Sequence, residues 1–122
     1  ILDLEDAVAP ESKTDARRAA VEAVRAGGFP RRIAVRVNAL GTAWGEDDLA
    51  ALADLSLDFV VAPKVEEPGV VDAYGARMAE GTRLIAMIET PRALMALPAI
   101  AWAGEPLAGL MLGVNDLAKA LG

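Results

Sequence analysis

The 122-residue sequence contains no cysteine and no histidine. Without cysteine the chain can form neither a disulfide framework nor a thiolate site, and without histidine it lacks the commonest general base. Acidic residues outnumber basic ones by 18 to 12, and no basic cluster offers a footprint for nucleic acid or for an anionic membrane. No apolar run approaches the roughly 20 residues of a membrane span. No leader-like segment is visible, so a soluble cytoplasmic protein is expected.

Short apolar runs typical of strands recur at intervals close to the length of one βα unit. They lie at residues 1–4, 33–37, 59–62, 84–88 and 110–112. The stretches between them repeat apolar residues at helical spacing, which predicts amphipathic helices. The predicted helices cover residues 12–26, 46–55, 68–79 and 91–102.

Single residues predict the ends and the buried face of these helices. Ser12 and Thr90 stand where a side chain can cap the first turn of the helix that follows. In the helix predicted over 91–102, a buried stripe is expected from Leu94, Leu97 and Ile100.

The alternation of strands and helices predicts a parallel sheet with helical crossovers. A doubly wound sheet is the main competitor, but it usually carries a glycine-rich phosphate loop, and the loop at 5–10 contains no glycine. Polar residues follow nearly every predicted strand, as they do at the catalytic face of a (β/α)₈ TIM barrel. Residues 1–122 are therefore expected to form one partial barrel domain of about five βα units, the central part of a longer polypeptide.

Two carboxylates form the sharpest candidate site. Glu89 and Asp116 follow consecutive predicted strands, which lie about 4.8 Å apart when they are neighbours in a sheet. Magnesium binds one or two carboxylates and fills its other positions with water and substrate oxygens. The pair is therefore the candidate ligand set for Mg²⁺, with Mn²⁺ as the alternative ion. In the competing interpretation both acids are helix-start residues stabilised by the helix dipole.

Other charged residues stand at strand ends with more than one possible role. Arg36 could hold a carboxylate or an enolate oxygen, or form a structural ion pair with Glu5 or Asp6. These two acids could orient metal-bound water or transfer protons, or they could be capping or solvated groups. Lys64 could form a Schiff base, although a structural pair with Glu66 is favoured.

The segment Gly113-Val114-Asn115 precedes and begins the last predicted helix. Backbone N–H groups at the start of a helix have no partner within it and lie at the positive end of its dipole. These three residues are therefore candidates for binding an anionic group of a substrate.

Six motifs in order resemble those of the citrate lyase β-subunit family. They are LDLEDAV at 2–8, VRVN at 35–38, GTAWGEDDL at 41–49, PKVE at 63–66, AMIETPR at 86–92 and MLGVNDLA at 111–118. The resemblance extends over essentially the whole chain. The wider HpcH/HpaI group includes malyl-CoA lyases, β-methylmalyl-CoA lyases and HpaI-type pyruvate aldolases.

The resemblance implies a (β/α)₈ barrel that assembles as a homotrimer or hexamer. It implies that Glu89 and Asp116 bind magnesium, that Arg36 contacts the oxo-acid and the developing enolate, and that Glu5 and Asp6 lie beside the metal-bound waters. HpaI-type aldolases have a histidine near the position of Asp6, so this residue favours the citrate-lyase-like branch. The family's first strand, with basic residues for CoA phosphates, and its last strands and lid are expected outside residues 1–122.

The functional hypothesis is a magnesium-dependent lyase that cleaves or forms a carbon–carbon bond of a hydroxyacyl-CoA. Cleavage of a citryl-CoA or malyl-CoA type substrate would give an acyl-CoA and oxaloacetate or glyoxylate. The partners would be a small oxo-acid and a CoA thioester, with no nucleic acid and no membrane. The alternatives are a CoA-independent, metal-dependent pyruvate aldolase and a non-catalytic barrel fragment.

Overall fold

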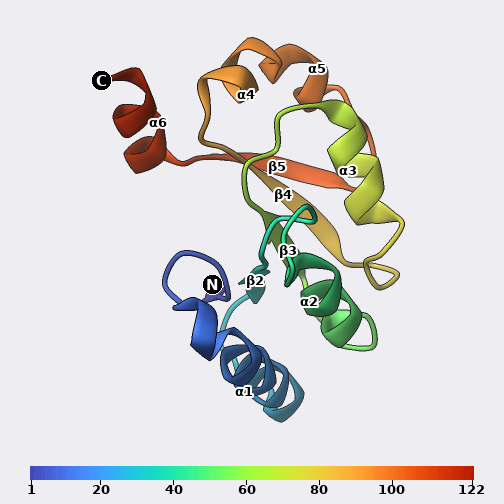
Figure 1. Ribbon diagram of the computed structural model, residues 1–122. Helices are drawn as coiled ribbons and strands as arrows, with labels where there is room; N and C mark the ends of the chain where they lie inside the picture. Colours follow the sequence, from blue (N-terminus) through green and yellow to red (C-terminus); the bar gives the residue numbers. More distant parts are fainter.

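The fold is a five-stranded parallel sheet, described over residues 1–122 by a computed structural model (Figure 1). The strands are β1 (Leu2–Asp3), β2 (Ala34–Arg36), β3 (Phe59–Ala62), β4 (Arg83–Ile88) and β5 (Leu107–Leu112). Each strand pairs in parallel with its successor, giving the order β1-β2-β3-β4-β5. The predicted parallel sheet is confirmed. The order never reverses, so the chain does not have the switch point of a doubly wound sheet.

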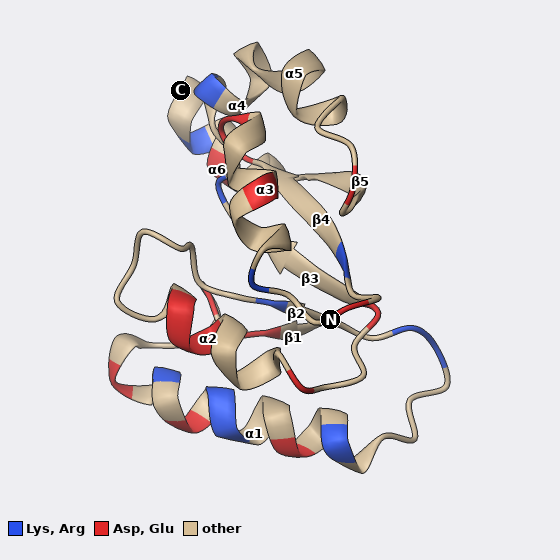
Figure 2. Cartoon of the chain, turned by 90° about the vertical axis from the view of Figure 1, so that its right-hand side faces the viewer, with Lys and Arg blue, Asp and Glu red and all other residues tan.

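Helices connect every pair of consecutive strands. They are the 3₁₀ helix η1 (Pro10–Ser12) with α1 (Lys13–Ala26), then α2 (Gly45–Leu52), α3 (Pro68–Gly75), the pair α4 (Pro91–Met95) and α5 (Leu97–Ala101), and α6 (Val114–Leu121) after β5. Acidic and basic residues are interspersed along α1 (Figure 2), which buries Ala20 and Val24 beneath them. None of these helices has the length and apolar character needed to cross a lipid bilayer.

The helix predicted over 91–102 is interrupted. Pro98 has no backbone N–H with which to continue the hydrogen-bond ladder, and the segment divides into α4 and α5 at Ala96. Ile100 is fully buried as predicted, but Leu94 is 37% exposed, so its place in a buried stripe was wrong. The capping prediction is confirmed for Thr90, whose side chain accepts the Ala93 N–H at 3.1 Å. It was wrong for Ser12, whose side chain caps nothing.

The two faces of the sheet have different roles, because successive side chains of a strand point to opposite faces. One face carries residues such as Val35, Val60 and Ala86, which pack with buried residues of α1 to α5 into the main core. The opposite face carries a small cluster of Ala34, Val61 and Met87, to which none of the helices contributes. Arg36 and Glu89 fall on this second face by the same alternation, at the carboxyl ends of β2 and β4.

Candidate active site

Arg36 is held by an aspartate that the sequence did not single out. The parallel register sets Asp3 directly opposite Arg36. Arg36 Nε donates to Asp3 Oδ1 at 2.8 Å and Nη2 donates to Oδ2, which makes the pair bidentate. Partial burial works against ionisation of Asp3, but hydrogen bonds from Arg36 and from backbone N–H groups outweigh it and lower the pKa of Asp3. The side-chain hydrogen bonds with Asp3 raise the pKa of Arg36, which therefore stays charged.

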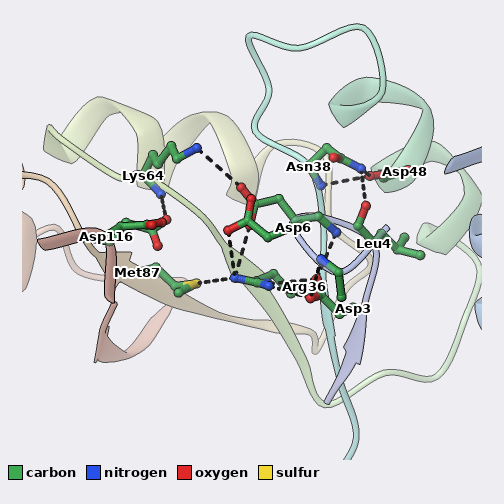
Figure 3. A network of polar contacts seen from close by, with 12 residues as sticks. Asp3, Leu4, Asp6, Arg36, Asn38, Asp48, Lys64, Met87 and Asp116 are labelled. Carbon is green, nitrogen blue, oxygen red and sulfur yellow. Dashed lines mark hydrogen bonds and ion pairs between the residues drawn. The ribbon is translucent and has the colours of Figure 1, made fainter. Parts of the chain in front are cut away.

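The remaining nitrogen of Arg36, Nη1, faces two acidic side chains and the sulfur of Met87. Nη1 lies 3.1 Å from Glu5 Oε2 and 3.9 Å from Asp6 Oδ2, and it also lies 3.9 Å from the sulfur of Met87. Figure 3 shows the guanidinium between Asp3 on one side and Met87 on the other. The sequence-based ion pair with Glu5 or Asp6 is thus present, but the tightest partner is Asp3.

Glu5 is a buried carboxylate without a regular hydrogen bond. Its side chain is 8% exposed, and Oε1 lies 3.7 Å from Lys64 Nζ while Oε2 faces Arg36. Although Arg36 is within ion-pair distance, Oε2 accepts no hydrogen bond of good geometry. Burial, reinforced by the neighbouring Asp6, raises the pKa of Glu5. The alternative of a solvated group was wrong for Glu5, whereas the side chain of Asp6 is 56% exposed.

Glu89 is buried at the end of β4, and its carboxylate points across the sheet. Oε1 accepts the backbone N–H of Lys64 at 2.8 Å, so it does not cap the helix that follows. Burial raises the pKa of Glu89; the Lys64 N–H opposes this shift, and the nearby negative charge of Asp116 adds to it. The other oxygen, Oε2, lies against Gly113, where a Cβ atom would come within 2.7 Å of it.

Asp116 lies in the first turn of α6, as the helix-dipole interpretation requires. Its side chain is 31% exposed, and its nearest basic partner is Lys119, at 3.4 Å on the same helix. Its charge also acts on Glu89. The position of Asp116 therefore satisfies both interpretations, whereas the position of Glu89 before the Thr90 cap favours a site role.

A cleft of about 490 Å³ collects nearly all the predicted site residues. It is lined by Asp6, Arg36, Glu89, Gly113, Val114, Asn115 and Asp116, with Ala7, Met87, Leu112 and Lys119. Glu5 does not line this cleft but a second hollow of about 320 Å³, with which the cleft shares Asp6. A hollow of about 550 Å³, somewhat larger than the cleft, lies at the amino-terminal ends of β4 and β5 and contains none of the predicted site residues.

The donor set of the cleft fits a magnesium-like ion better than zinc. The chain has no group of three or more His, Cys, Asp or Glu side chains arranged to hold a metal. Structural and catalytic zinc sites need three or four such ligands, whereas Mg²⁺ binds one or two carboxylates and keeps several waters. Glu89 Oε2, which has no basic partner, and Asp116 Oδ2, the oxygen that Lys119 does not contact, are available for that purpose.

A buried polar network supports the loop that carries Glu5 and Asp6. Lys13 Nζ donates to the carbonyl oxygens of Leu4 at 2.9 Å and Glu5 at 2.7 Å, and it lies 5.2 Å from the centre of the Trp44 ring. The burial of Lys13 was not predicted from the sequence, because a lysine at the start of an amphipathic helix is normally exposed to solvent. Its buried position fixes how the chain leaves β1.

Asp48 belongs to the same network, through its contact with Asn38. The acidic first turn of α2 matches the helix dipole, yet Asp48 is fully buried. It accepts hydrogen bonds from Arg17 Nε at 2.8 Å and from the side chain of Asn38 at 2.7 Å. Asn38 in turn donates to the carbonyl oxygen of Leu4 at 2.9 Å. The network therefore joins α1, α2 and the ends of β1 and β2.

Lys64 does not pair with Glu66, contrary to the favoured prediction. Its ammonium lies 3.7 Å from Glu5. Glu66 instead accepts the Thr90 hydroxyl at 2.8 Å and lies 3.8 Å from Arg92. Lys64 has φ = 51°, which makes it the one residue other than glycine with a positive φ. Such a conformation costs about 1–2 kcal/mol for an L-residue with a side chain.

The sequence profile of the HpcH/HpaI aldolase/citrate lyase family matches residues 1–122. The chain belongs to this family. A (3S)-malyl-CoA thioesterase of Cereibacter sphaeroides is 39% identical over 123 residues, which are 100% of this chain and 42% of that protein. The chain thus spans about two fifths of the length of the curated relatives that it matches.

Several solved structures are similar to this chain in both fold and sequence. RipC from Yersinia pestis superposes with a TM-score of 0.86 at 36% identity, over 98% of this chain and 54% of that one. The citrate lyase β subunit of Mycobacterium tuberculosis, in complex with oxaloacetate and magnesium, gives a TM-score of 0.81 at 38% identity, over 98% of this chain and 50% of that one. The same protein with magnesium, acetoacetate and coenzyme A gives 0.82 at 38% identity, over 98% and 42%.

Proposed function

We propose that the complete protein is a magnesium-dependent carbon–carbon lyase acting on a hydroxyacyl-CoA of the citryl-CoA or malyl-CoA type. The observation that carries the proposal is the single cleft shared by Glu89, Asp116 and Arg36. Two carboxylates with open oxygens and one guanidinium are the groups needed to bind a divalent cation together with a small anionic oxo-acid.

We also propose that the five strands are part of a (β/α)₈ barrel. Their sequential order and the placement of α1 to α5 against one face support this, because a barrel keeps its helices outside and its chemistry at the carboxyl ends of the strands. The cleft lies at those ends. A homotrimer or hexamer is part of the same proposal, and exposed apolar side chains such as Met95 and Trp102 are compatible with subunit contacts.

Magnesium or manganese bound by Glu89 and Asp116 would supply a Lewis acid and a template for the oxygens of the oxo-acid. Arg36 would stabilise the negative charge that develops as the carbon–carbon bond breaks. Asp3 occupies Nε and Nη2 of Arg36, so Nη1 is the nitrogen left to face the substrate. Glu5, whose pKa is raised by burial, would hold or release a proton beside Arg36.

The substrate class rests on the relatives. The Cereibacter sphaeroides protein is named for malyl-CoA, and the Mycobacterium tuberculosis protein binds oxaloacetate with magnesium, and coenzyme A with magnesium and acetoacetate. We infer the same pair of ligands here, a small oxo-acid at the metal and a CoA thioester beside it. The N–H groups of Val114 and Asn115, at the start of α6, would bind the carboxylate of the acid.

The experiment is a kinetic and calorimetric comparison of the complete protein with its Glu89→Gln and Asp116→Asn variants. Removing either carboxylate should lower kcat/KM for citryl-CoA or malyl-CoA by at least about 100-fold, because a bound metal contributes several kcal/mol. EDTA should have the same effect on the wild type. Glu80→Gln, at the opposite edge of the sheet, is the matched control and should leave the rate unchanged.

Each contrary result has a defined meaning. Activity that survives EDTA would refute the metal-dependent lyase. Turnover of free 4-hydroxy-2-oxo acids with no response to CoA thioesters would identify a pyruvate aldolase instead. Calorimetry that detects binding of neither magnesium nor oxaloacetate would indicate a protein without this catalytic site.

A further inference from the structure

Lys64 occupies a backbone conformation that suits glycine better than lysine. It follows β3 by two residues and has φ = 51°. Its Cβ atom makes this conformation unfavourable, whereas a glycine would adopt it freely. A residue that keeps such a conformation is expected to be held there by its surroundings, and such residues cluster at functional sites.

The conformation lets one residue reach carboxylates that belong to two different strands. The Lys64 N–H donates to Glu89 Oε1 at 2.8 Å, beyond the end of β4. The Lys64 ammonium lies 3.7 Å from Glu5 Oε1, beyond the end of β1. Figure 3 shows both contacts leaving Lys64 in different directions, one from its backbone and one from the tip of its side chain. Lys64 therefore connects the buried carboxylate of Glu5 with Glu89, the proposed metal ligand.

Only one of these two contacts requires a lysine. A glycine could donate its N–H to Glu89 equally well and without steric cost, so the backbone contact does not account for the side chain. The side chain adds a positive charge that balances Glu5, which otherwise faces only Arg36, a cation already shared with Asp3. The Lys64 side chain is 51% exposed, so it contributes little to the core.

We propose that Lys64 is a positioning residue for catalysis, whose ammonium holds the Glu5 carboxylate in line with Arg36 while its N–H fixes Glu89. This inference rests on the proposed function. In this role Lys64 forms no covalent bond with the substrate, and it does not serve to stabilise the core. Its ion pair keeps the two oxygens of Glu5 divided between Lys64 and Arg36, and this holds the carboxyl group beside Arg36.

The test is Lys64→Gly in the complete protein, measured by thermal unfolding, by magnesium calorimetry and by steady-state kinetics. Glycine keeps the N–H on Glu89 and removes the unfavourable Cβ, so the melting temperature should equal or exceed that of the wild type. Magnesium should bind no more weakly, because a positive charge near Glu89 is lost and the N–H contact remains. The value of kcat should fall at least about tenfold, as for other groups that orient a site residue.

Two further variants separate charge from backbone effects. Lys64→Met keeps the unfavourable conformation and lacks the charge, so it should lose kcat like the glycine variant and unfold at a lower temperature than that variant. Lys64→Arg restores a cation and should recover part of kcat.

Three results would overturn the inference. The first is a kcat for Lys64→Gly within twofold of the wild type. The second is a joint loss of melting temperature and magnesium affinity in that variant, which would make Lys64 a structural residue. The third is Lys64→Met turning over at the wild-type rate. In each case the wild type would still be an active, metal-dependent lyase, whereas a wild type that lacks this activity would refute the proposed function and this inference together.

Discussion

Replacing Gly113 by alanine tests the packing on which the proposed metal site depends. Gly113 joins β5 to α6 and lies directly against Glu89. Its φ of −87° is accessible to any residue, so alanine introduces no backbone strain. The only new atom is a methyl carbon, and that carbon would overlap the Cβ of Glu89 and come within 2.7 Å of its Oε2.

The size of the effect follows from these contacts. Ordinary van der Waals contact begins at 3.4 Å, so the carboxylate must retreat by about 0.7 Å, and the Cβ atoms must separate further still. Rotating the Glu89 side chain cannot relieve the second overlap, because Cβ is fixed to the backbone. The ends of β4 and β5 must therefore move apart. Overpacking of this kind costs about 1–3 kcal/mol of stability. A displacement of about 1 Å at a reacting group costs about 100-fold in rate.

The assays are urea unfolding without metal, magnesium calorimetry and kcat/KM on the complete protein. Gly113→Ala should be destabilised, should bind magnesium more weakly and should lose about 100-fold in rate. Gly69→Ala is the matched control, since a Cβ at this exposed position of α3 meets nothing within 4 Å. The reasoning would be refuted by a Gly113→Ala protein that unfolds at the wild-type urea concentration and binds magnesium with wild-type affinity.

Three more outcomes follow from the same contacts. Asp3→Asn should lower kcat about 10–100-fold by freeing Arg36. Because the pKa of Asp3 is lowered in the folded protein, the ionised carboxylate stabilises the fold above its unfolded-state pKa, and this stabilisation is lost in acid. In urea unfolding, the loss of stability in the variant relative to the wild type should therefore shrink as pH falls. Asp48→Ala should cost about 3 kcal/mol in urea unfolding, since Arg17 and the backbone N–H of Asn38 lose a buried acceptor. Burial raises the pKa of Glu89, and only its ionised form binds a cation, so calorimetry should show magnesium affinity falling as pH drops through that pKa; a pH-independent affinity would contradict this.

The sheet was predictable because its strands are apolar runs separated by helical patterns. The strand predicted at 59–62 has those bounds in the structure, and the strand predicted at 84–88 begins one residue earlier. The last strand begins at Leu107 instead of residue 110, because pairing with β4 extends it through Gly109. From the local sequence alone, a glycine at this position indicates the end of a strand. Pairing between strands, which no single segment contains, decides such boundaries.

The candidate site was predictable only in part, for a related reason. The sequence marks acids and Arg36 at strand ends, and their convergence on one cleft follows from parallel strands ending at one edge. It does not say which of Asp3, Glu5 and Asp6 faces Arg36, since that depends on the register between β1 and β2. Lys13 was missed because its burial arises only when the loop after β1 folds over it.

The charges of the cleft give a reason for a cation to be present before an oxo-acid binds. Glu89, Asp116 and Asp6 line it as acids. Of its two cations, Arg36 is already paired with Asp3, and Lys119 lies 3.4 Å from Asp116. An oxo-acid that approached these groups alone would add negative charge beside Glu89, whose pKa is raised by burial and, to a smaller degree, by the negative charge of Asp116. A divalent ion held by two of the carboxylates reverses that balance, and it leaves Nη1 of Arg36 to select the substrate. We therefore expect the metal to bind first and the acid second, because the carboxylates of the cleft repel the acid until a cation is bound and Arg36 is already paired with Asp3.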